Sequence, residues 1–440
     1  MSRSNGQARG VPQFVAVIGA GYVGLPTAAT LANFGHSVTL AERDPTRLAA
    51  LRRGTMPIVE AGLDDLVASS TSAGRLRFTD SATDAVRGAE FVFLCVATPQ
   101  SDDGSADLSF VEAAAKEIGP KLKPGAIVVN KSTVPVGSTT MVEQVIGRSD
   151  IDVVSNPEFL REGTAVLDSL NPDRIVVGAD DAQAAAKVGE LFAATGAPLI
   201  VTDATTSETI KYASNAFLAT KLSFVNALAG LCEEVGADAR DVLLGLGYDK
   251  RIGFEFLRPG PGWGGSCLPK DTQALLHIAR EAGYDFSLLA GAIASNDEQL
   301  SRVMTKVEAA CGGSLAGTTV AVWGLTFKAN TDDRRDSPAL QITRRLVRLG
   351  ATVRAFDPTV EADGDAPDDL RGLQLCGDPY DAALGARAVV VLTEWDEFRW
   401  LDFSRVQAVM AQPAIVDARN LLDPAAVRRM GFHYAGIGRQ

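Results

Sequence analysis

The strongest constraint on the fold is a short apolar run that ends in three closely spaced glycines. Residues 14–18 have the composition of a buried strand, and Gly19, Gly21 and Gly24 follow in a Gly-x-Gly-x-x-Gly pattern. Gly19 permits a tight turn, Gly21 lets a ligand approach the backbone, and Gly24 lets a helix pack closely on the strand. The pattern predicts the first strand–helix unit of a dinucleotide-binding parallel sheet.

Strand and helix alternate in two blocks of the chain. In the first block, buried strands are predicted at residues 14–18, 37–41, 90–96, 126–130, 151–154 and 174–177. In the second block, strands are predicted at 320–323, 352–356, 388–392 and 414–416, with a helix at 337–349. Because helix-like segments separate the runs, we expect an α/β fold with two Rossmann-like parallel sheets.

A long helix is predicted between the two blocks. Residues 207–234 contain no proline and one glycine, and their apolar residues recur at helical spacing. At about 1.5 Å per residue, this helix is about 40 Å long. The 440-residue length suggests about three domains. We therefore expect domains at 1–203, 204–312 and 313–440, the middle one helical.

Composition narrows the functional class. The net charge of -12 argues against nucleic acid as the main partner. No apolar run approaches the roughly 20 residues of a membrane span, and the polar residues 1–13 do not resemble a secretion signal. Five scattered cysteines predict no disulfide framework and favour a reducing cytoplasm. Three separate histidines make a metal site unexpected.

The predicted second strand ends in an acidic residue, Glu42, 18 residues after Gly24. A carboxylate at this place accepts hydrogen bonds from the adenosine ribose and repels a 2′-phosphate, which predicts NAD and not NADP as cofactor. Arg43 and Arg47 lie close by and weaken the preference. The alternative is that Glu42 is a solvated strand end.

One cysteine has the surroundings of a reactive thiol. Cys267 follows a glycine-rich segment and precedes a predicted helix at 272–282, with Pro269 in its first turn. A helix start and the nearby Lys270 both stabilise a thiolate, and Asp271 could orient a water. The alternative is a small buried side chain, which is the interpretation we favour for the other cysteines, Cys95, Cys232, Cys311 and Cys376.

A polar site is also predicted on the long helix. Lys211 and Asn215 are four residues apart and share a face in an otherwise apolar pattern. With so few histidines, the proton acceptor for an oxidation is Lys211, Asp271 or a bound water. The alternative for Lys211 and Asn215 is a helix start at the surface.

Eight ordered motifs resemble those of the UDP-glucose/GDP-mannose dehydrogenase family. They are GAGYVGLP at 19–26, CVATP at 95–99, KSTVPVG at 131–137, NPEFLREG at 156–163, KYASN at 211–215, RIG at 251–253, GGSCLPKD at 264–271 and GLTFKANTDDRRDS at 324–337. The resemblance covers nearly the whole chain. It implies an NAD-dependent, four-electron oxidation of a nucleotide sugar, in which the C6 alcohol becomes a carboxylate.

The resemblance also implies roles for individual residues and places the sugar nucleotide on domain 313–440. The catalytic set is Cys267, Lys211, Asn215, Asp271, Glu158 and Thr133. The cofactor set is Gly19, Gly21, Tyr22, Val23, Gly24, Glu42, Arg47, Thr98, Thr133, Glu162, Lys270 and Arg335. The substrate set is Glu158, Phe159, Leu160, Arg161, Lys211, Asn215, Arg251, Phe256, Leu257, Arg258, Pro259, Gly260, Gly264, Lys328 and Arg419.

The expected substrate is UDP-glucose, oxidised to UDP-glucuronate. Ser266 stands where members acting on N-acetylmannosamine derivatives usually have histidine, and residues 171–174 and 251–253 resemble members acting on UDP-glucose. GDP-mannose and UDP-N-acetylhexosamines stay open as substrates. Two other classes compete with this interpretation: a two-electron hydroxyacid dehydrogenase, which needs no thiolate, and a non-catalytic NAD sensor.

The expected mechanism uses Cys267 for the second oxidation. Its thiolate adds to the aldehyde to form a thiohemiacetal, a second hydride leaves, and water releases the acid from the thioester. Whether Lys211 first forms an imine stays open. The long helix has apolar residues on more than one side, and with the resemblance this predicts a homodimer or a higher homo-oligomer.

Overall fold

The structure, a computed structural model, describes residues 11–101, 103–362 and 366–439. The chain forms two compact units, one of Met1–Ser214 with Gln273–Glu281 and one of Asn215–Thr272 with Ala282–Gln440. The polar segment 1–13 and the acidic segment 361–369 lie partly outside the described residues. The three domain ranges stay a prediction.

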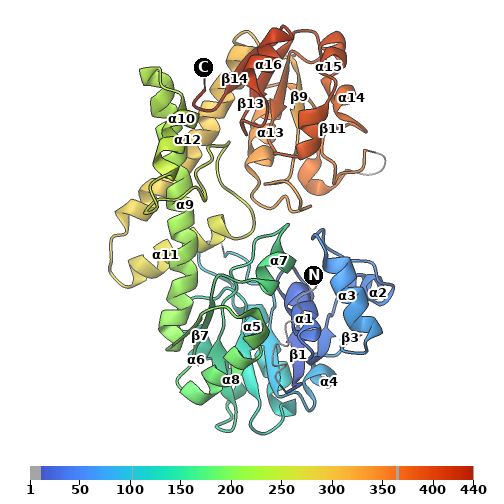
Figure 1. The fold of residues 1–440 in the computed structure, drawn as a ribbon, viewed down its shortest axis with the longest axis vertical. Helices are drawn as coiled ribbons and strands as arrows, with labels where there is room; N and C mark the ends of the chain where they lie inside the picture. Colours follow the sequence, from blue (N-terminus) through green and yellow to red (C-terminus); the bar gives the residue numbers. More distant parts are fainter. Residues whose placement is uncertain (1–10, 102, 363–365, 440) are drawn as a thin grey trace, which may run out of the picture. The chain divides into compact units, whose positions relative to one another are not determined.

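The first unit contains an eight-stranded sheet in the order β3-β2-β1-β4-β5-β6-β7-β8. Figure 1 labels three of its strands, β1, β3 and β7. Its strands are β1 Phe14–Ile18, β2 Ser37–Ala41, β3 Leu76–Thr79, β4 Phe91–Leu94, β5 Ile127–Asn130, β6 Asp152–Ser155, β7 Ile175–Gly178 and β8 Leu199–Thr202. The six predicted strands are confirmed to within two residues, and β3 and β8 were not predicted.

One junction in this sheet is antiparallel, so the expectation of a wholly parallel sheet is wrong there. β6 and β7 pair at Ser155 and Gly178 in opposite directions. The segment joining them is anchored by buried Glu60, whose carboxylate accepts hydrogen bonds at 2.7 Å from Gly163 N and Ala165 N. From there the chain passes through the short helix α7, Ala165–Leu170, and enters β7 in the direction opposite to β6.

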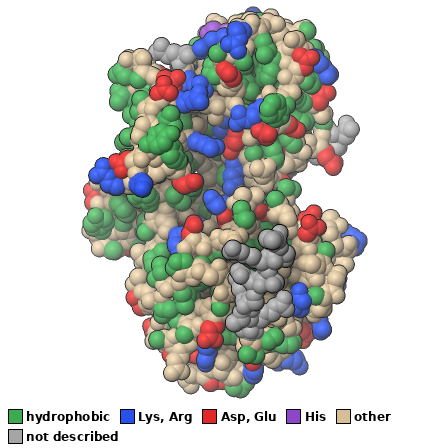
Figure 2. Space-filling model, viewed as in Figure 1, with side chains coloured by type: hydrophobic (Ala, Val, Ile, Leu, Met, Phe, Trp, Pro, Cys, Tyr) green, Lys and Arg blue, Asp and Glu red, His purple; other side chains and the backbone are tan. Residues whose placement is uncertain are grey.

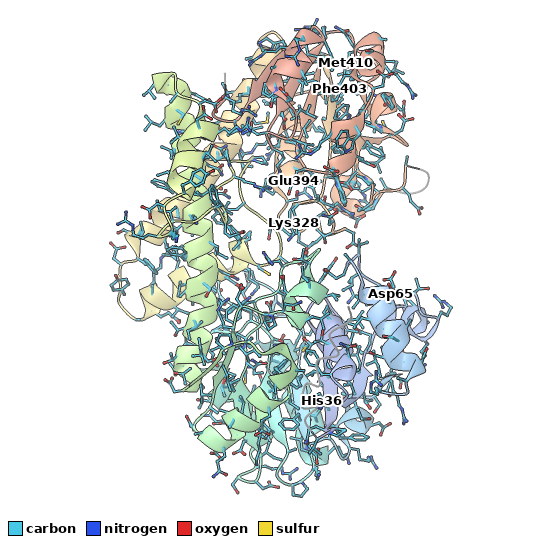
Figure 3. The ribbon with its side chains drawn as sticks, in the orientation of Figure 1. His36, Asp65, Lys328, Glu394, Phe403 and Met410 are labelled. Carbon is cyan, nitrogen blue, oxygen red and sulfur yellow. The ribbon has the colours of Figure 1, made fainter. Side chains whose placement is uncertain are left out.

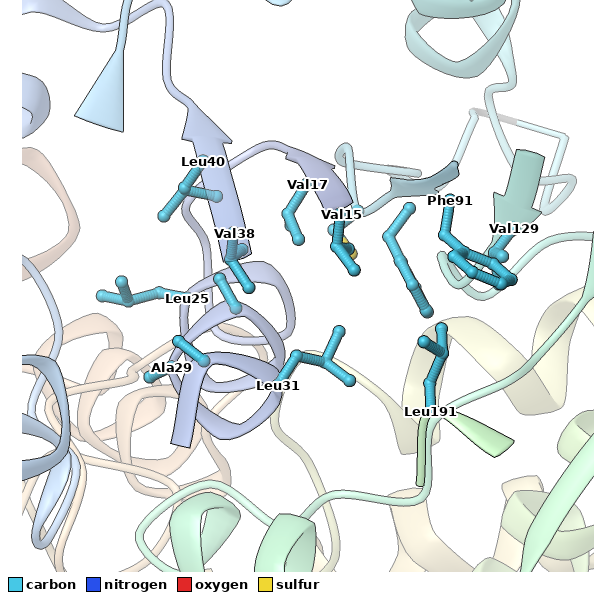
Figure 4. Close-up of a cluster of buried hydrophobic side chains, with 14 of the residues drawn as sticks. Val15, Val17, Leu25, Ala29, Leu31, Val38, Leu40, Phe91, Val129 and Leu191 are labelled. Carbon is cyan, nitrogen blue, oxygen red and sulfur yellow. The ribbon is translucent and has the colours of Figure 1, made fainter. Parts of the chain in front are cut away.

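Helices cover the first sheet and close its core. They are α1 Gly24–Asn33, α2 Pro45–Arg52, α3 Leu63–Ser72, α4 Ala82–Val86, α5 Ser109–Ile118, α6 Ser138–Ile146, α7 Ala165–Leu170 and α8 Ala182–Glu190. Leu25 and Leu31 of α1 are fully buried against Val15 and Val17 of β1, as Figure 4 shows. This packing fixes the turn between β1 and α1, where the glycine motif lies.

The second unit contains a six-stranded sheet in the order β11-β10-β9-β12-β13-β14, with every pair parallel. Its strands are β9 Thr319–Trp323, β10 Thr352–Phe356, β11 Gln374–Leu375, β12 Ala388–Val391, β13 Ala414–Asp417 and β14 His433–Gly436. Its helices are α13 Pro338–Arg348, α14 Pro379–Ala383, α15 Phe403–Val409 and α16 Pro424–Arg429. The second predicted Rossmann-like sheet is confirmed.

Four further helices make up the predicted helical segment: α9 Ala204–Val235, α10 Ala239–Gly247, α11 Leu268–Glu281 and α12 Ser287–Ala310. The 32-residue α9 confirms the long helix predicted at 207–234. Within the described residues it is also the one helix long and apolar enough to cross a membrane. Its buried Glu208, Lys211 and Asn226 favour a helix inside the protein.

Candidate active site

The glycine turn after β1 leaves no room for side chains at two of its three glycines. A Cβ on Gly19 would lie 2.6 Å from the Cys95 carbonyl oxygen, and one on Gly24 would lie 1.9 Å from the Gly19 carbonyl oxygen. A Cβ on Gly21 would meet nothing within 4 Å, so this glycine borders open space. Gly19 and Gly24 therefore serve packing, and Gly21 is where a ligand can approach the backbone.

The start of α1 suits an anionic group. Among the described residues no side chain caps α1 at Val23, and its first turn contains no acidic residue. The first N–H groups of a helix lack partners within it and favour negative charge. Together with open space at Gly21, the turn fits the pyrophosphate of a dinucleotide, with Tyr22 and Val23 half-buried beside it.

Glu42 lies at the end of β2, beside this turn, and is not a solvated strand end. It is buried, and its carboxylate accepts hydrogen bonds from Ala20 N at 3.1 Å and Asp44 N at 2.8 Å. The carboxylate thus ties the glycine turn to the start of α2. Arg47, in the first turn of α2, is exposed.

A buried ion pair joins the loop that follows β6 to helix α9. Lys211 Nζ lies 2.7 Å from Glu158 Oε1, and the two side chains are 4% and 5% exposed. Burial alone would raise the pKa of Glu158, but the Lys211 ammonium and a hydrogen bond from Leu160 N hold that pKa below its usual range. The pair is therefore ionised, and it places an ammonium in a largely dry environment.

A second lysine in the same unit was given no role by the sequence analysis. Lys131 is buried, and its Nζ lies 3.1 Å from Asn156 Oδ1. Burial lowers the pKa of Lys131 to about 8, and burial raises the pKa of the Cys95 thiol to about 12. Lys131 begins the motif at 131–137, and Asn156 begins the motif at 156–163. A sequence motif does not reveal which of its residues are buried against one another.

The remaining predicted residues of the first unit also have protein partners. Thr98 Oγ1 donates to the Thr133 carbonyl at 2.9 Å, which joins two predicted cofactor positions. The Arg161 Nε donates to Asp168 at 3.1 Å, and the Phe159 ring stacks on the Arg174 guanidinium at 3.7 Å. Glu162 and Leu160 are half-buried in the same loop.

In the second unit, Asp271 is the centre of a buried polar cluster. It is fully buried, and its two carboxylate oxygens accept hydrogen bonds from Asn215 Nδ2 and Lys270 Nζ, each at 2.6 Å. Asn215 lies one turn after Lys211 on α9. The structure thus brings together three predicted residues from α9 and α11.

Cys267 immediately precedes α11, as predicted. It is the one cysteine that is partly exposed, whereas the other four are buried. Its Sγ lies 3.5 Å from Ser266 Oγ, and α11 begins at Leu268 with Pro269 as its second residue. The thiol is accessible and lies at a helix N-terminus, and both conditions favour a reactive thiolate.

The predicted substrate loop is held by buried polar side chains that the sequence analysis missed. Gly260 N donates to Asn226 Oδ1 at 2.9 Å, and Gln299 Nε2 donates to the Gly260 carbonyl at 2.7 Å. Trp263 Nε1 donates to Ser223 Oγ at 2.8 Å. Asn215, Ser223 and Asn226 recur at helical spacing on α9, so this polar stripe was visible in the sequence.

Other members of the predicted substrate set are distributed around this loop. Leu257 is buried beside Val225 and Leu243. A Cβ on Gly264 would lie 2.1 Å from the Asp336 carbonyl oxygen, which explains that glycine by packing. Phe256 and Pro259 are half-buried, and Arg258 is exposed. Arg251 is 89% exposed and pairs with Asp249.

Loops at the carboxyl ends of β9, β12 and β13 carry the last predicted residues. Arg419 Nη2 donates to the Phe327 carbonyl at 2.6 Å, and its Nε lies 3.0 Å from Glu394. Lys328 follows Phe327, and Figure 3 labels Lys328 and Glu394 in this unit. Arg335 pairs with Asp333 at 2.7 Å.

A carboxylate repeats the arrangement of Glu42 in the second sheet. Asp357, after β10, accepts hydrogen bonds from Leu325 N at 2.7 Å and Trp395 Nε1 at 3.2 Å. It fixes the turn that follows β9, where Gly324 has a φ of 91°. Ligands of such sheets bind beyond the carboxyl ends of the strands, so this turn is placed for a ligand.

Three family models match successive parts of the chain. They describe the NAD binding domain (residues 13–195), the central domain (205–298) and the UDP binding domain (321–424) of the UDP-glucose/GDP-mannose dehydrogenase family.

Similar proteins match over nearly the full length. A UDP-glucose 6-dehydrogenase of Rhizobium meliloti is 48% identical over 97% of this chain and 99% of its own length. One of Pseudomonas aeruginosa is 45% identical over 96% and 97%. The solved structure of a UDP-glucose dehydrogenase from Pyrobaculum islandicum is 35% identical, with a TM-score of 0.89 over 98% of each chain. On these matches, the chain belongs to the UDP-glucose/GDP-mannose dehydrogenase family.

Proposed function

We propose that this chain is a UDP-glucose 6-dehydrogenase, which oxidises UDP-glucose to UDP-glucuronate with NAD. The observation that carries the proposal is the partly exposed thiol of Cys267 at the start of α11. Only an oxidation that continues past the aldehyde needs such a nucleophile. Relatives named UDP-glucose 6-dehydrogenase at 44–48% identity support this substrate.

NAD, when bound, accepts a hydride. The glycine turn and the uncapped start of α1 would hold its pyrophosphate, and Glu42 would accept hydrogen bonds from its adenosine ribose. We assign Arg47, Thr98, Thr133, Glu162, Lys270 and Arg335 to the rest of the cofactor. This assignment predicts NAD in preference to NADP.

The first oxidation removes a proton from the C6 hydroxyl and a hydride from C6, which bound NAD would accept, and it leaves an aldehyde. If Lys211 lost its proton before the reaction, the Glu158 carboxylate would be buried without a cationic partner, which is costly in free energy. We therefore assign the Lys211 ammonium and the Asn215 amide to stabilising oxyanion charge, and a water or Asp271 to accepting the proton.

The second oxidation uses the thiol. The Cys267 thiolate adds to the aldehyde carbon, the carbonyl oxygen takes a proton, and a thiohemiacetal results. Loss of its hydroxyl proton to a water or Asp271, and of its C–H hydride, which a second NAD would accept, gives a thioester. Water then attacks the thioester carbonyl. The C–S bond breaks, the Cys267 thiolate is restored, and the carboxylic acid is released. We assign the positioning of that water to Glu158, to Asp271 or to both.

The sugar nucleotide is assigned to the second sheet and its neighbouring loops. We place it against residues 256–260 and Gly264, with Lys328 and Arg419 as the cationic contacts and residues 158–161 at the sugar. Ser266 argues for UDP-glucose over N-acetylated sugars. GDP-mannose and UDP-N-acetylhexosamines are the alternatives. The three-domain division at 1–203, 204–312 and 313–440 is part of the same proposal.

We infer that the chain forms a homodimer through α9. Phe217, Phe224 and Leu231 recur every seven residues and are 69%, 60% and 56% exposed. A row of large apolar side chains on one helix requires a partner, and an apolar helix face of a second copy matches it. Five free cysteines and the acidic charge favour a cytoplasmic enzyme without nucleic-acid or membrane partners.

The test is to incubate the purified chain with NAD and each candidate sugar nucleotide and follow absorbance at 340 nm. The proposal expects turnover with UDP-glucose at least about tenfold more efficient than with GDP-mannose or UDP-N-acetylhexosamines, a difference of about 1.4 kcal/mol. Turnover with another sugar nucleotide alone would change the substrate. No turnover, with NAD still bound, would favour the NAD sensor.

A further inference from the structure

The outward face of α13 is a row of arginines. Leu340, Ile342 and Leu346 are buried on one side of this helix, while Arg344, Arg345 and Arg348 lie on the other. Arg344 and Arg348 are four residues apart, so two like charges share one face and weaken the helix. The chain has a net charge of -12, so this local excess of positive charge indicates a surface that binds an anion.

These arginines border a hollow. It has a volume of about 470 Å³, lies within the second unit, and is lined on one side by α13. Arg371, Asp369 and Leu373 line it from the segment before β11. This volume falls in the range of about 300–1,000 Å³ that is typical of small-molecule sites. On the face shown in Figure 2, acidic and basic side chains are interspersed, whereas four arginines and one carboxylate line this hollow. One of the four, Arg371, pairs with Asp368 at 2.7 Å, so the excess positive charge comes from the three arginines of α13.

The one carboxylate is already neutralised. Asp369 Oδ2 accepts a hydrogen bond from Arg334 Nε at 2.8 Å, so it does not balance the arginines of α13. Within the described residues no ion pair involves Arg344, Arg345 or Arg348. Arg344 donates only to the Asp369 carbonyl, at 3.3 Å, and Arg345 only to Ser301 Oγ, at 3.3 Å. Three guanidinium groups therefore keep most of their donors available.

A second hollow continues the same surface. It has a volume of about 420 Å³, lies between α12 and α13, and shares Arg345 and Arg348 with the first. Glu308 is the acidic residue that lines it. The shared arginines can thus be reached from both sides, which suits an extended anion better than a single-charge ion.

We propose that the α13 hollow binds a small anion that carries adjacent phosphate groups, such as a nucleoside triphosphate or inorganic triphosphate. Guanidinium groups donate paired hydrogen bonds that match phosphate oxygens, and several of them together select for multiple charge. The site uses none of the residues that we assign to NAD or to the sugar nucleotide. It is a site for a third ligand, and it does not depend on the proposed function.

The test measures binding of inorganic triphosphate and, separately, ATP by isothermal titration calorimetry, with UDP and NAD present at saturation to fill other phosphate sites. The variant is Arg344→Ala with Arg348→Ala. The matched control is Arg52→Ala with Arg53→Ala, an exposed arginine pair on the first unit. The conservative variant, Arg344→Lys with Arg348→Lys, keeps the charge.

The expected result is one triphosphate per chain, bound at least about tenfold more weakly by the alanine variant and unchanged in the control. The lysine variant should retain part of the affinity, and added salt should weaken binding in the wild type. Equal binding of ATP and inorganic triphosphate means that phosphates alone are recognised, and tighter ATP binding means that the base adds contacts. No binding by the wild type, equal affinity in both alanine variants, or binding of a single-stranded oligonucleotide alone would overturn the proposal.

Discussion

At the scale of single residues, the partly exposed thiol of Cys267 is the feature that distinguishes a four-electron from a two-electron enzyme. Replacing Cys267 by serine should reduce formation of UDP-glucuronate by at least about a thousandfold, because a hydroxyl is a much weaker nucleophile than a thiolate. NAD binding should not change. Chromatography of the products and fluorescence titration of NAD measure the two effects.

The matched control is Cys376→Ala, which removes a buried thiol that directly follows β11 in the second unit. This variant should keep wild-type turnover. If Cys267→Ser produced UDP-glucuronate at the wild-type rate, the thiol would be structural.

Glu42 holds the glycine turn and is also assigned to the cofactor ribose. Glu42→Ala should weaken NAD binding by about tenfold or more, because a hydrogen bond to a charged group is lost. It should also reduce the preference for NAD over NADP, because the carboxylate no longer repels a 2′-phosphate. Titration of NAD, NADP and UDP-glucose checks this. Equal weakening of NAD and UDP-glucose would mean that Glu42 is structural only.

The lowered pKa of Lys131 predicts how the free energy of unfolding depends on pH. The pKa of Lys131 is about 8 in the folded chain, whereas its usual value is 10.5. Between pH 8 and pH 10.5, Lys131 therefore carries a proton in the unfolded chain that it lacks in the folded chain. The contribution of Lys131 to the free energy of unfolding therefore rises with pH across this window and is least favourable below pH 8. Cys95 acts in the opposite direction, since its folded pKa is raised.

The comparison is made in a Cys95→Ala background, because Lys131 and Cys95 interact electrostatically and removing the lysine would also change the pKa of the thiol. Urea unfolding at pH 7.5 and pH 10 should show Cys95→Ala gaining stability relative to Cys95→Ala with Lys131→Met as pH rises, by up to about 3 kcal/mol. A constant difference between the two proteins would contradict a pKa near 8.

At the scale of elements, α9 carries the predicted subunit contact. Phe224→Glu should separate the subunits, because a charge in the middle of an apolar interface is costly to bury. The control is Trp400→Glu, which changes a side chain that is 79% exposed outside α9. Light scattering should give twice the 46.2 kDa chain mass for wild type and control, and the chain mass for Phe224→Glu. A wild type that is fully active as a monomer would refute the interface.

The strand predictions were correct where both faces of a strand are buried, and they missed the strands at the edges of the sheets. Central strands such as β1, β4 and β12 are continuous apolar runs, because helices cover both faces. The missed strands β3, β8, β11 and β14 all lie at the edges of their sheets. β3 (LRFT), β11 (QL) and β14 (HYAG) contain few apolar residues, as edge strands permit. β8 (LIVT) is an apolar run that the sequence analysis did not assign as a strand.

The positions of candidate site residues were predicted where a short segment determines them, while their roles stay a prediction. Cys267 before α11 and the Lys211–Asn215 spacing are properties of short segments, and the structure places both as expected. The pairing of Lys131 with Asn156, or of Asn296 with the backbone of Trp263, joins residues 25 and 33 positions apart. Such contacts follow from the sheet order and the helix packing, which no local pattern contains.

At the scale of the whole molecule, product stoichiometry tests whether all the assigned groups act in one reaction. Two hydrides leave the same carbon, so two NADH should appear for each UDP-glucose consumed. The Lys211 ammonium and the Asn215 amide serve the alcohol step, and the Cys267 thiolate captures the aldehyde before it leaves. Absorbance at 340 nm and chromatography of the sugar nucleotides, measured in one reaction, give the ratio.

The aldehyde should therefore not accumulate at any point in the time course. The Cys267→Ser variant provides the internal comparison, since it keeps the alcohol-oxidising groups and loses the trap. Its reaction should approach one NADH per UDP-glucose, with aldehyde released to solvent. A wild-type ratio near one, with the aldehyde as the main product, would mean that the accessible thiol at the start of α11 takes no part and that the chain is a two-electron alcohol dehydrogenase.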